Sequence, residues 1–251
     1  AGVAPAAIES LLLALADDEL VLGYWDSEWT GIAPILEEDV AFASLAQDEI
    51  GHAQALYQLL ADLDGGDPDA LAYGRAPEEY RHARLLDHPR TDWAFSVARR
   101  FLYDTADAAR LDALAGSAYE PLAEVVAKMR REETYHLLHM HAWVERLAGG
   151  GEEPRARLTT ALERLWPDAL CMLDGIEGDE LLAEAGVLAE PTAAVRRRWL
   201  ADLAPELNRL GLPGPPDAHV GPCRGPGRSD DFRWLWEQFT MVRRSDPEAV
   251  W

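Results

Sequence analysis

The chain has 251 residues, of which 48% are hydrophobic and 27% are charged, and these values are typical of a folded protein and exclude a disordered one. The formal net charge of -22 argues against nucleic acid and anionic membranes as partners, because both are bound by clustered lysines and arginines. The two cysteines, Cys171 and Cys223, are too few for a disulfide-rich scaffold or a thiolate zinc cluster.

Helical periodicity dominates the chain, and alternating strand patterns are scarce. Four long helices are predicted, at about 5–31, 35–63, 93–116 and 119–148, the third with Thr91 or Asp92 as its N-cap. The first 20 residues have no cationic flank, and acidic residues interrupt their apolar run. They therefore predict neither a signal peptide nor a membrane span, and we expect a cytoplasmic protein.

The rest of the chain predicts shorter elements. Two amphipathic helices, at about 155–176 and 190–211, precede a Pro/Gly-rich loop and a last aromatic helix whose side chains are expected to pack on the core. Trp251 is expected to dock on another subunit. No change of composition marks a second domain, so we expect one all-α domain over 1–251. It would consist of a four-helix bundle at about 5–148 and two or three accessory helices at about 155–251.

A glutamate followed three residues later by a histidine occurs three times, at Glu49/His52, Glu79/His82 and Glu133/His136. The first and last pairs lie within the apolar stripe of a long helix, where both side chains face the core. The middle pair lies in a short segment bounded by prolines, which predicts an exposed turn, and we set it aside.

The other two long helices each offer an inward carboxylate. Asp104 lies in the apolar stripe of the third helix, with Asp107 at its margin. On the first helix Glu28 is the best candidate, because it shares a face with Leu20 and Tyr24. The other acids available there are Asp17, Asp18, Glu19 and Asp26. Several buried carboxylates that face one another need cations or protons to neutralise them.

Two divalent ions would balance four such carboxylates. One carboxylate from each of two helices and an E-x-x-H pair from each of two others is the ligand pattern of ferritin-like di-iron and di-manganese bundles. Mixed carboxylate and imidazole ligands favour iron, or else manganese, over zinc. One such pair alone is more often a salt bridge or a satisfied core histidine. Two pairs, together with two lone acids, favour a dinuclear metal site.

The motifs also resemble a known family. The strings "LEEDVAFASLAQDEIGHAQALYQLL", "REETYHLLHMHAWVERL" and "ALERLWPDALCMLD" are similar to subunits of the bacterial multicomponent phenylacetyl-CoA epoxidase, the PaaA/PaaC family of ferritin-like proteins. The likeness spans nearly the whole chain. Length and "DDELVLGYWDSEWTGIAPILEED" resemble PaaC, a structural partner whose metal site is degraded in familiar members. In contrast, "QDEIGH" and "EETYH" are similar to the metal motifs of the catalytic PaaA protein.

The resemblance implies a ferritin-like fold and a reduced di-iron centre that inserts one oxygen atom of dioxygen into the ring of phenylacetyl-CoA. The ligands it implies are Glu28, Glu49, His52, Asp104, Glu133 and His136. It also implies electrons from a separate reductase and other epoxidase subunits in a homo- or hetero-oligomer. Arginine runs at 99–100, 130–131 and 196–198 are candidates for binding the phosphates of CoA.

Three functions remain open at this point. The chain is an oxygenase subunit with a working di-iron site, a structural subunit of the same complex, or another ferritin-like protein, either a different di-iron oxidase or an iron-handling protein. No catalytic residues are predicted beyond the metal ligands.

Overall fold

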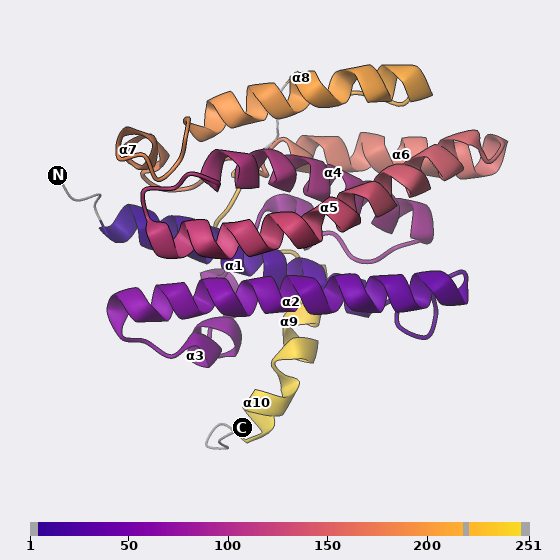
Figure 1. Ribbon diagram of the computed structural model, residues 1–251. Helices are drawn as coiled ribbons and strands as arrows, with labels where there is room; N and C mark the ends of the chain where they lie inside the picture. Colours follow the sequence, from indigo (N-terminus) through magenta and orange to yellow (C-terminus); the bar gives the residue numbers. More distant parts are fainter. Residues whose placement is uncertain (1–4, 218–220, 247–251) are drawn as a thin grey trace. The chain divides into compact units, whose positions relative to one another are not determined.

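The computed structural model describes residues 5–217 and 221–246, and these contain ten α-helices, two short 3-10 helices and no strand (Figure 1). The helices are α1 (Pro5–Ser27), α2 (Leu36–Asp64), α3 (Pro68–Tyr73), α4 (Trp93–Leu114), α5 (Glu120–Gly149), α6 (Glu152–Ala169), α7 (Asp179–Glu184), α8 (Thr192–Leu210), α9 (Asp230–Phe239) and α10 (Met241–Ser245), with the 3-10 helices η1 (Pro77–Glu79) and η2 (Arg84–Asp87). The predicted all-α fold is confirmed, and it is consistent with a ferritin-like helical bundle. None of the helices in the described ranges is long and apolar enough to cross a membrane.

The described residues fall into two compact units. The first unit contains α4 to α8 together with short segments at 5–8 and 83–85. The second unit contains α2, α3, α9, α10 and α1 from Glu9 onward. The single domain expected over 1–251 stays a prediction, and Trp251, expected to dock on a neighbouring protein, lies outside the described residues.

Helix α4 is central to the first unit, where it contacts α5, α6 and α8 (Figure 1). Asp92 is its N-cap, as predicted, and accepts a hydrogen bond from the backbone N–H of Phe95 at 2.8 Å. Most residues of α4 are buried, and these include Arg99 and Arg100. This arginine pair therefore does not lie at a substrate entrance, which corrects one of the three expected phosphate-binding runs.

In the second unit α1 and α2 pack closely at Gly23. A β-carbon at this position would lie 2.9 Å from Cγ1 of Ile50, 3.0 Å from the carbonyl oxygen of Ala46 and 3.1 Å from Cβ of Glu49. Only a glycine allows this approach, because contacts so short are avoided in well-packed interiors. The approach holds the backbone of α1 against the turn of α2 that carries Glu49.

The last helices pack on the second unit through aromatic side chains. Phe232, Leu235 and Phe239 of α9 are buried, and the ring of Phe239 stacks on Tyr24 at a centroid distance of 4.8 Å. Trp236 donates a hydrogen bond through Nε1 to the carbonyl oxygen of Arg75 at 2.9 Å. The expected packing of this aromatic helix on the core is confirmed for Phe239 and Trp236, but it was wrong for Trp234, which is 46% exposed.

Candidate metal centre

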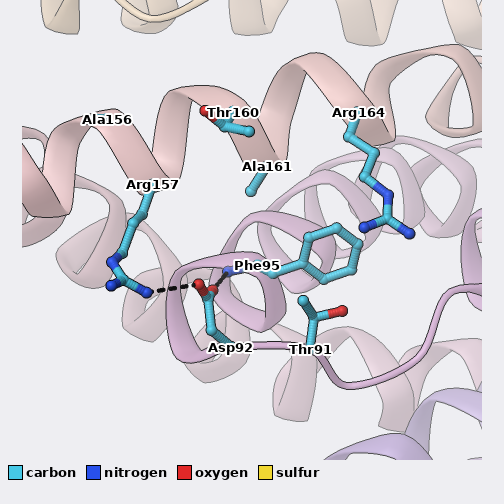
Figure 2. Close-up of a pocket in the computed structure, with 8 residues that line it drawn as sticks. All are labelled: Thr91, Asp92, Phe95, Ala156, Arg157, Thr160, Ala161 and Arg164. Carbon is cyan, nitrogen blue, oxygen red and sulfur yellow. Dashed lines mark hydrogen bonds and ion pairs between the residues drawn. The ribbon is translucent and has the colours of Figure 1, made fainter.

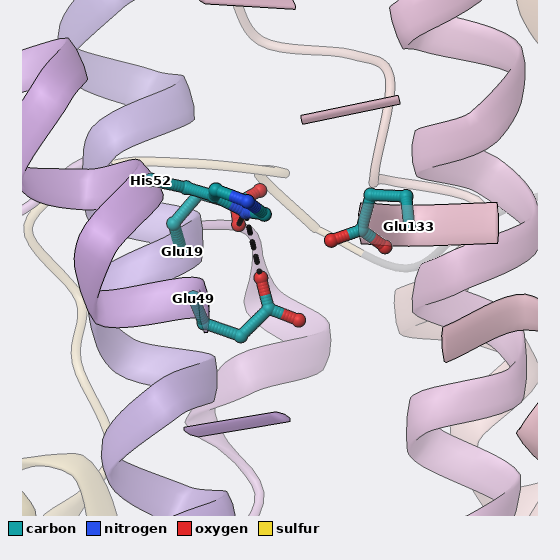
Figure 3. A group of neighbouring side chains, drawn as sticks. All are labelled: Glu19, Glu49, His52 and Glu133. Atoms are coloured by element: carbon teal, nitrogen blue, oxygen red, sulfur yellow. Dashed lines mark hydrogen bonds and ion pairs between the residues drawn. The ribbon is translucent and has the colours of Figure 1, made fainter. Parts of the chain in front are cut away.

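Helices α1 and α2 bring two carboxylates and a histidine together inside the second unit. Glu49 and His52 lie one turn apart on α2, and Glu19 of α1 faces them (Figure 3). Nδ1 of His52 lies 3.2 Å from Oε2 of Glu19 and 3.3 Å from Oε2 of Glu49. Each residue is at most 1% exposed. Each also offers a ligand atom within 4.8 Å of those of the other two.

This group, Glu19, Glu49 and His52, is a donor set that fits a divalent metal ion. Carboxylate oxygens with an imidazole nitrogen suit iron or manganese, and buried carboxylates need a counter-charge. A proton on His52 can supply that charge. Burial lowers the pKa of His52, but its hydrogen bonds with Glu19 and Glu49 outweigh burial and raise the pKa to about 12. Metal binding at Nδ1 would release this proton, because a ligating imidazole must be neutral.

Glu19 lies where the sequence suggested Glu28. Glu28 follows the last residue of α1, in a turn, and is partly exposed. The sequence did not single out Glu19, because α1 is buried on nearly all sides and an apolar stripe therefore gives no contrast. As a metal ligand Glu28 stays a prediction, and Glu19 is the α1 carboxylate that the structure brings to Glu49 and His52.

The neighbouring acid Asp17 belongs to a different network in the second unit. It forms an ion pair with Arg75 and accepts hydrogen bonds from the hydroxyl of Tyr57 and the backbone N–H of Arg81. The guanidinium of Arg75 also lies over the ring of Tyr80 at 4.1 Å. The guanidinium of Arg75 therefore neutralises the carboxylate of Asp17.

Helices α4 and α5 form a second group of polar side chains inside the first unit. Nε of Arg100 lies 3.0 Å from Oδ1 of Asp104, one turn along α4. Nη2 of Arg100 lies 2.9 Å from Nδ1 of His136 on α5, and the same Nδ1 lies 3.0 Å from Oε1 of Glu133. All four residues are buried. The structure thus brings Asp104, Glu133 and His136 together, but with an arginine among them.

Arg100 is the residue that sequence reasoning missed. From the sequence it was part of an arginine run that was a candidate for binding the phosphates of CoA, although it lies four residues before Asp104 and therefore on the same face of the helix. A guanidinium stays protonated in proteins, so Arg100 provides a fixed positive charge beside these carboxylates.

The sequence matches the model of the family described as "Phenylacetic acid catabolic protein" over residues 3–251. The chain belongs to this family. It is 32% identical to the C subunit of 1,2-phenylacetyl-CoA epoxidase from Escherichia coli (strain K12) over 201 residues, which cover 80% of this chain and 81% of the relative. It is 26% identical to the A subunit of the same enzyme over 233 residues, which cover 90% of this chain and 74% of that relative.

A pocket of about 350 Å³ lies between α4 and α5 and reaches Glu133. Its lining includes Arg130, which pairs with Asp112 at 2.6 Å, and Arg131. A neighbouring pocket of about 210 Å³ shares part of this lining and adds residues of α8, among them Arg198. Two of the three arginine runs therefore contribute to pockets in the first unit.

Another pocket, with a volume of about 300 Å³, lies between the start of α4 and helix α6 (Figure 2). Arg157 at its edge pairs with Asp92 at 3.2 Å. Arg164 lies over the ring of Phe95 at 5.1 Å. Its charged side chains are thus already engaged with one another or with an aromatic ring, and we assign no function to this pocket.

The third E-x-x-H copy differs from the other two. The side chain of Glu79 accepts a hydrogen bond from the backbone N–H of Ala76 at 2.6 Å and so caps η1. His82 is fully buried, so its expected exposure was wrong. Its Nε2 lies 2.8 Å from Asp87 and 3.1 Å from Arg228. Arg228 covers it from 146 residues further along the chain, a contact that local periodicity does not reveal.

Proposed function

We propose that the chain is a subunit of a multicomponent oxygenase that converts phenylacetyl-CoA to a ring epoxide with dioxygen. The observation that carries the proposal is the buried group of Glu19, Glu49 and His52, whose donor atoms suit a redox-active divalent metal. Membership of the family and the similarity to two epoxidase subunits support it. Such a protein works with other subunits of the complex, in a homo- or hetero-oligomer.

We propose iron as the metal, with manganese as the alternative. The ligands predicted from the sequence are Glu28, Glu49, His52, Asp104, Glu133 and His136. We propose that the iron is held by Glu49 and His52 of α2 with an α1 carboxylate, for which the structure favours Glu19 over Glu28. Iron, when bound, supplies the activation of dioxygen. A separate reductase must supply the electrons, because the sequence contains no flavin, nicotinamide or cysteine-cluster motif.

The residues of the chain would hold and shield this centre. The carboxylates of Glu19 and Glu49 would offset the charge of the metal, and Nδ1 of His52 would bind it in the neutral form of the imidazole. Close packing at Gly23 fixes the backbone that carries Glu49. The buried apolar side chains around them, such as Leu45 and Leu56 of α2, exclude water.

The pocket beside Glu133 is the place where we propose that the acyl-CoA approaches the first unit. Arg130 and Arg131 lie at this pocket, and arginines suit the phosphates of a CoA thioester. Arg131 is exposed, so its guanidinium can reach a phosphate without losing a buried contact.

The alternative is a structural partner in the same complex whose metal site is vestigial. Two observations favour it over an iron-handling protein: the identity is higher to the C subunit of the epoxidase than to its A subunit, and Arg100 lies among the predicted ligands of the first unit.

Iron content and product formation test the proposal together. The chain, purified under anaerobic conditions with ferrous iron, is expected to hold at least one iron per chain, and Glu49→Gln is expected to lower that content. Glu79→Gln is the matched control, because it alters an E-x-x-H pair outside the group and leaves the iron content unchanged. With the partner subunits and reductase, epoxide of phenylacetyl-CoA is measured by mass spectrometry. A wild type that contains no iron, or a Glu49→Gln variant with the iron content of the wild type, contradicts the metal centre. Unchanged epoxide formation by the complex with Glu49→Gln supports the structural alternative.

A further inference from the structure

The α4–α5 group contains a cation of its own at the place where the family pattern requires metal. The group consists of Asp104, Glu133 and His136, and Arg100 contacts two of the three directly. We infer that Arg100 excludes a metal ion from this group, so that the chain gains one more metal ion when Arg100 is removed. The inference rests on the proposed metal centre only for the identity of the ligands.

The exclusion operates at one atom, Nδ1 of His136. A neutral imidazole has a single lone pair on its acceptor nitrogen, whereas a guanidinium only donates. Nη2 of Arg100 lies 2.9 Å from this Nδ1, which also lies 3.0 Å from Oε1 of Glu133, so the guanidinium stands beside the nitrogen whichever ring nitrogen carries the proton. A metal ion bound to Nδ1 would lie at about 2.1 Å from the nitrogen and would have to share this space with the positively charged guanidinium. The ion and the guanidinium cannot both be there.

Charge supports the same conclusion. Nε of Arg100 lies 3.0 Å from Asp104, and both side chains are withdrawn from solvent. A buried carboxylate that is already paired with an arginine gains less from a metal ion than an unpaired one, because the ion must first replace the arginine. Arg100 cannot lose its charge by deprotonation, since a guanidinium keeps its proton in proteins. The whole side chain must leave before the metal enters.

An ordinary ion pair within a helix does not account for this arrangement. Pairs of arginine and aspartate four residues apart are common on helices and need no further partner. Arg100 also reaches across to the E-x-x-H histidine of a second helix. The same helix provides a comparison in Arg110, a buried arginine that pairs with Asp107 and contacts the hydroxyl of Tyr103.

Metal stoichiometry tests the inference without any measurement of activity. The full chain and Arg100→Gln are titrated anaerobically with ferrous iron, and bound iron is counted by mass spectrometry. The variant is expected to hold one ion per chain more than the wild type, and the double variant Arg100→Gln/His136→Gln is expected to lose that ion. Arg110→Gln is the matched control and keeps the wild-type count. Equal counts in wild type and Arg100→Gln overturn the inference.

A second measurement needs no variant of Arg100 and so does not depend on whether that variant folds. His136→Gln alone is expected to leave the iron content of the chain unchanged, because Arg100 already takes up Nδ1. A loss of iron from His136→Gln means that the group holds metal in the presence of Arg100 and overturns the inference. A wild type that binds no iron contradicts the proposed α1–α2 centre. If Arg100→Gln then binds one ion, the inference about Arg100 still holds. The failure of the proposed centre can therefore be told apart from the failure of the inference.

Discussion

Gly23 of α1 lies against Glu49 of α2 so closely that a β-carbon at position 23 would be 3.1 Å from Cβ of Glu49. The same β-carbon would be 3.0 Å from the carbonyl oxygen of Ala46, which is part of a helix and has little freedom to move. The approach of the two helices and the position of the α2 ligands are therefore set by one missing methyl group.

We expect Gly23→Ala to lower both stability and iron content. Overpacking costs about 1–3 kcal/mol, which exceeds the gain of about 1 kcal/mol in helix propensity. Urea unfolding and iron analysis measure the two effects. Gly51→Ala in α2 is the control, because nothing lies within 4 Å of its added methyl, and it is expected to raise stability by up to about 1 kcal/mol. A Gly23→Ala variant that is as stable as Gly51→Ala would contradict this account.

Variants of Glu19 and Glu28 are expected to differ in iron binding, because we propose Glu19 as the α1 ligand in place of Glu28. Glu19→Gln is expected to reduce iron binding to Glu49 and His52, because it removes a carboxylate 3.2 Å from Nδ1 of His52. Glu28→Gln is expected to have no effect, since Glu28 lies in the turn after α1. Anaerobic iron titration of both variants decides between them. Loss of iron in Glu28→Gln alone would restore the assignment made from sequence.

The buried ion pair of Asp17 and Arg75 is expected to stabilise the second unit strongly. Arg75→Leu leaves the carboxylate of Asp17 buried without its arginine, which costs about 3 kcal/mol or more. Arg157→Leu is the comparison, because Arg157 pairs with Asp92 at the surface and such pairs contribute about 0–1 kcal/mol. Thermal unfolding of both variants measures the difference, and similar losses in the two would refute the distinction.

His82 is expected to make stability depend on pH between about 7.5 and 5.5. Burial and the charge of Arg228 lower the pKa of His82 below its ordinary value, although Asp87 opposes them. The unfolded chain therefore binds this proton first, so the contribution is full above pH 6.5 and declines as the pH falls below it. His82→Gln is expected to reduce the loss of stability on acidification, measured from urea unfolding at both pH values. The difference between wild type and variant removes the effects of the other histidines, and an unchanged pH slope would count against the prediction.

The features that sequence could predict are those set by near neighbours in the chain. Helix α4 begins where Asp92 can cap it, and the inward positions of Glu49 and His52 follow from the spacing of apolar residues on α2. Glu19 could not be separated from the other acids of α1, because that helix is buried nearly all round and has no polar face for comparison.

The rest depends on contacts between distant parts of the chain. Arg100 contacts His136, which lies 36 residues further on, and this contact could not be read from the local sequence. The burial of His82 likewise depends on Arg228. Charge alone predicts an exposed position for an arginine, and only the fold provides the carboxylates that make a buried one stable.

The first unit also contains a disulfide between Cys171 and Cys223, which joins the end of α6 to the Pro/Gly-rich loop with Cα atoms 4.7 Å apart. The segment it closes spans 52 residues and contains α7 and α8. A loop of this length restricts the unfolded chain by about 4 kcal/mol on the chain-entropy model. Stabilities measured with and without a thiol reductant therefore refer to two different unfolded chains. Helix α8, whose Trp199 donates a hydrogen bond to Thr105 of α4 in the folded protein, lies within a covalently closed loop only in the unfolded chain that keeps the disulfide.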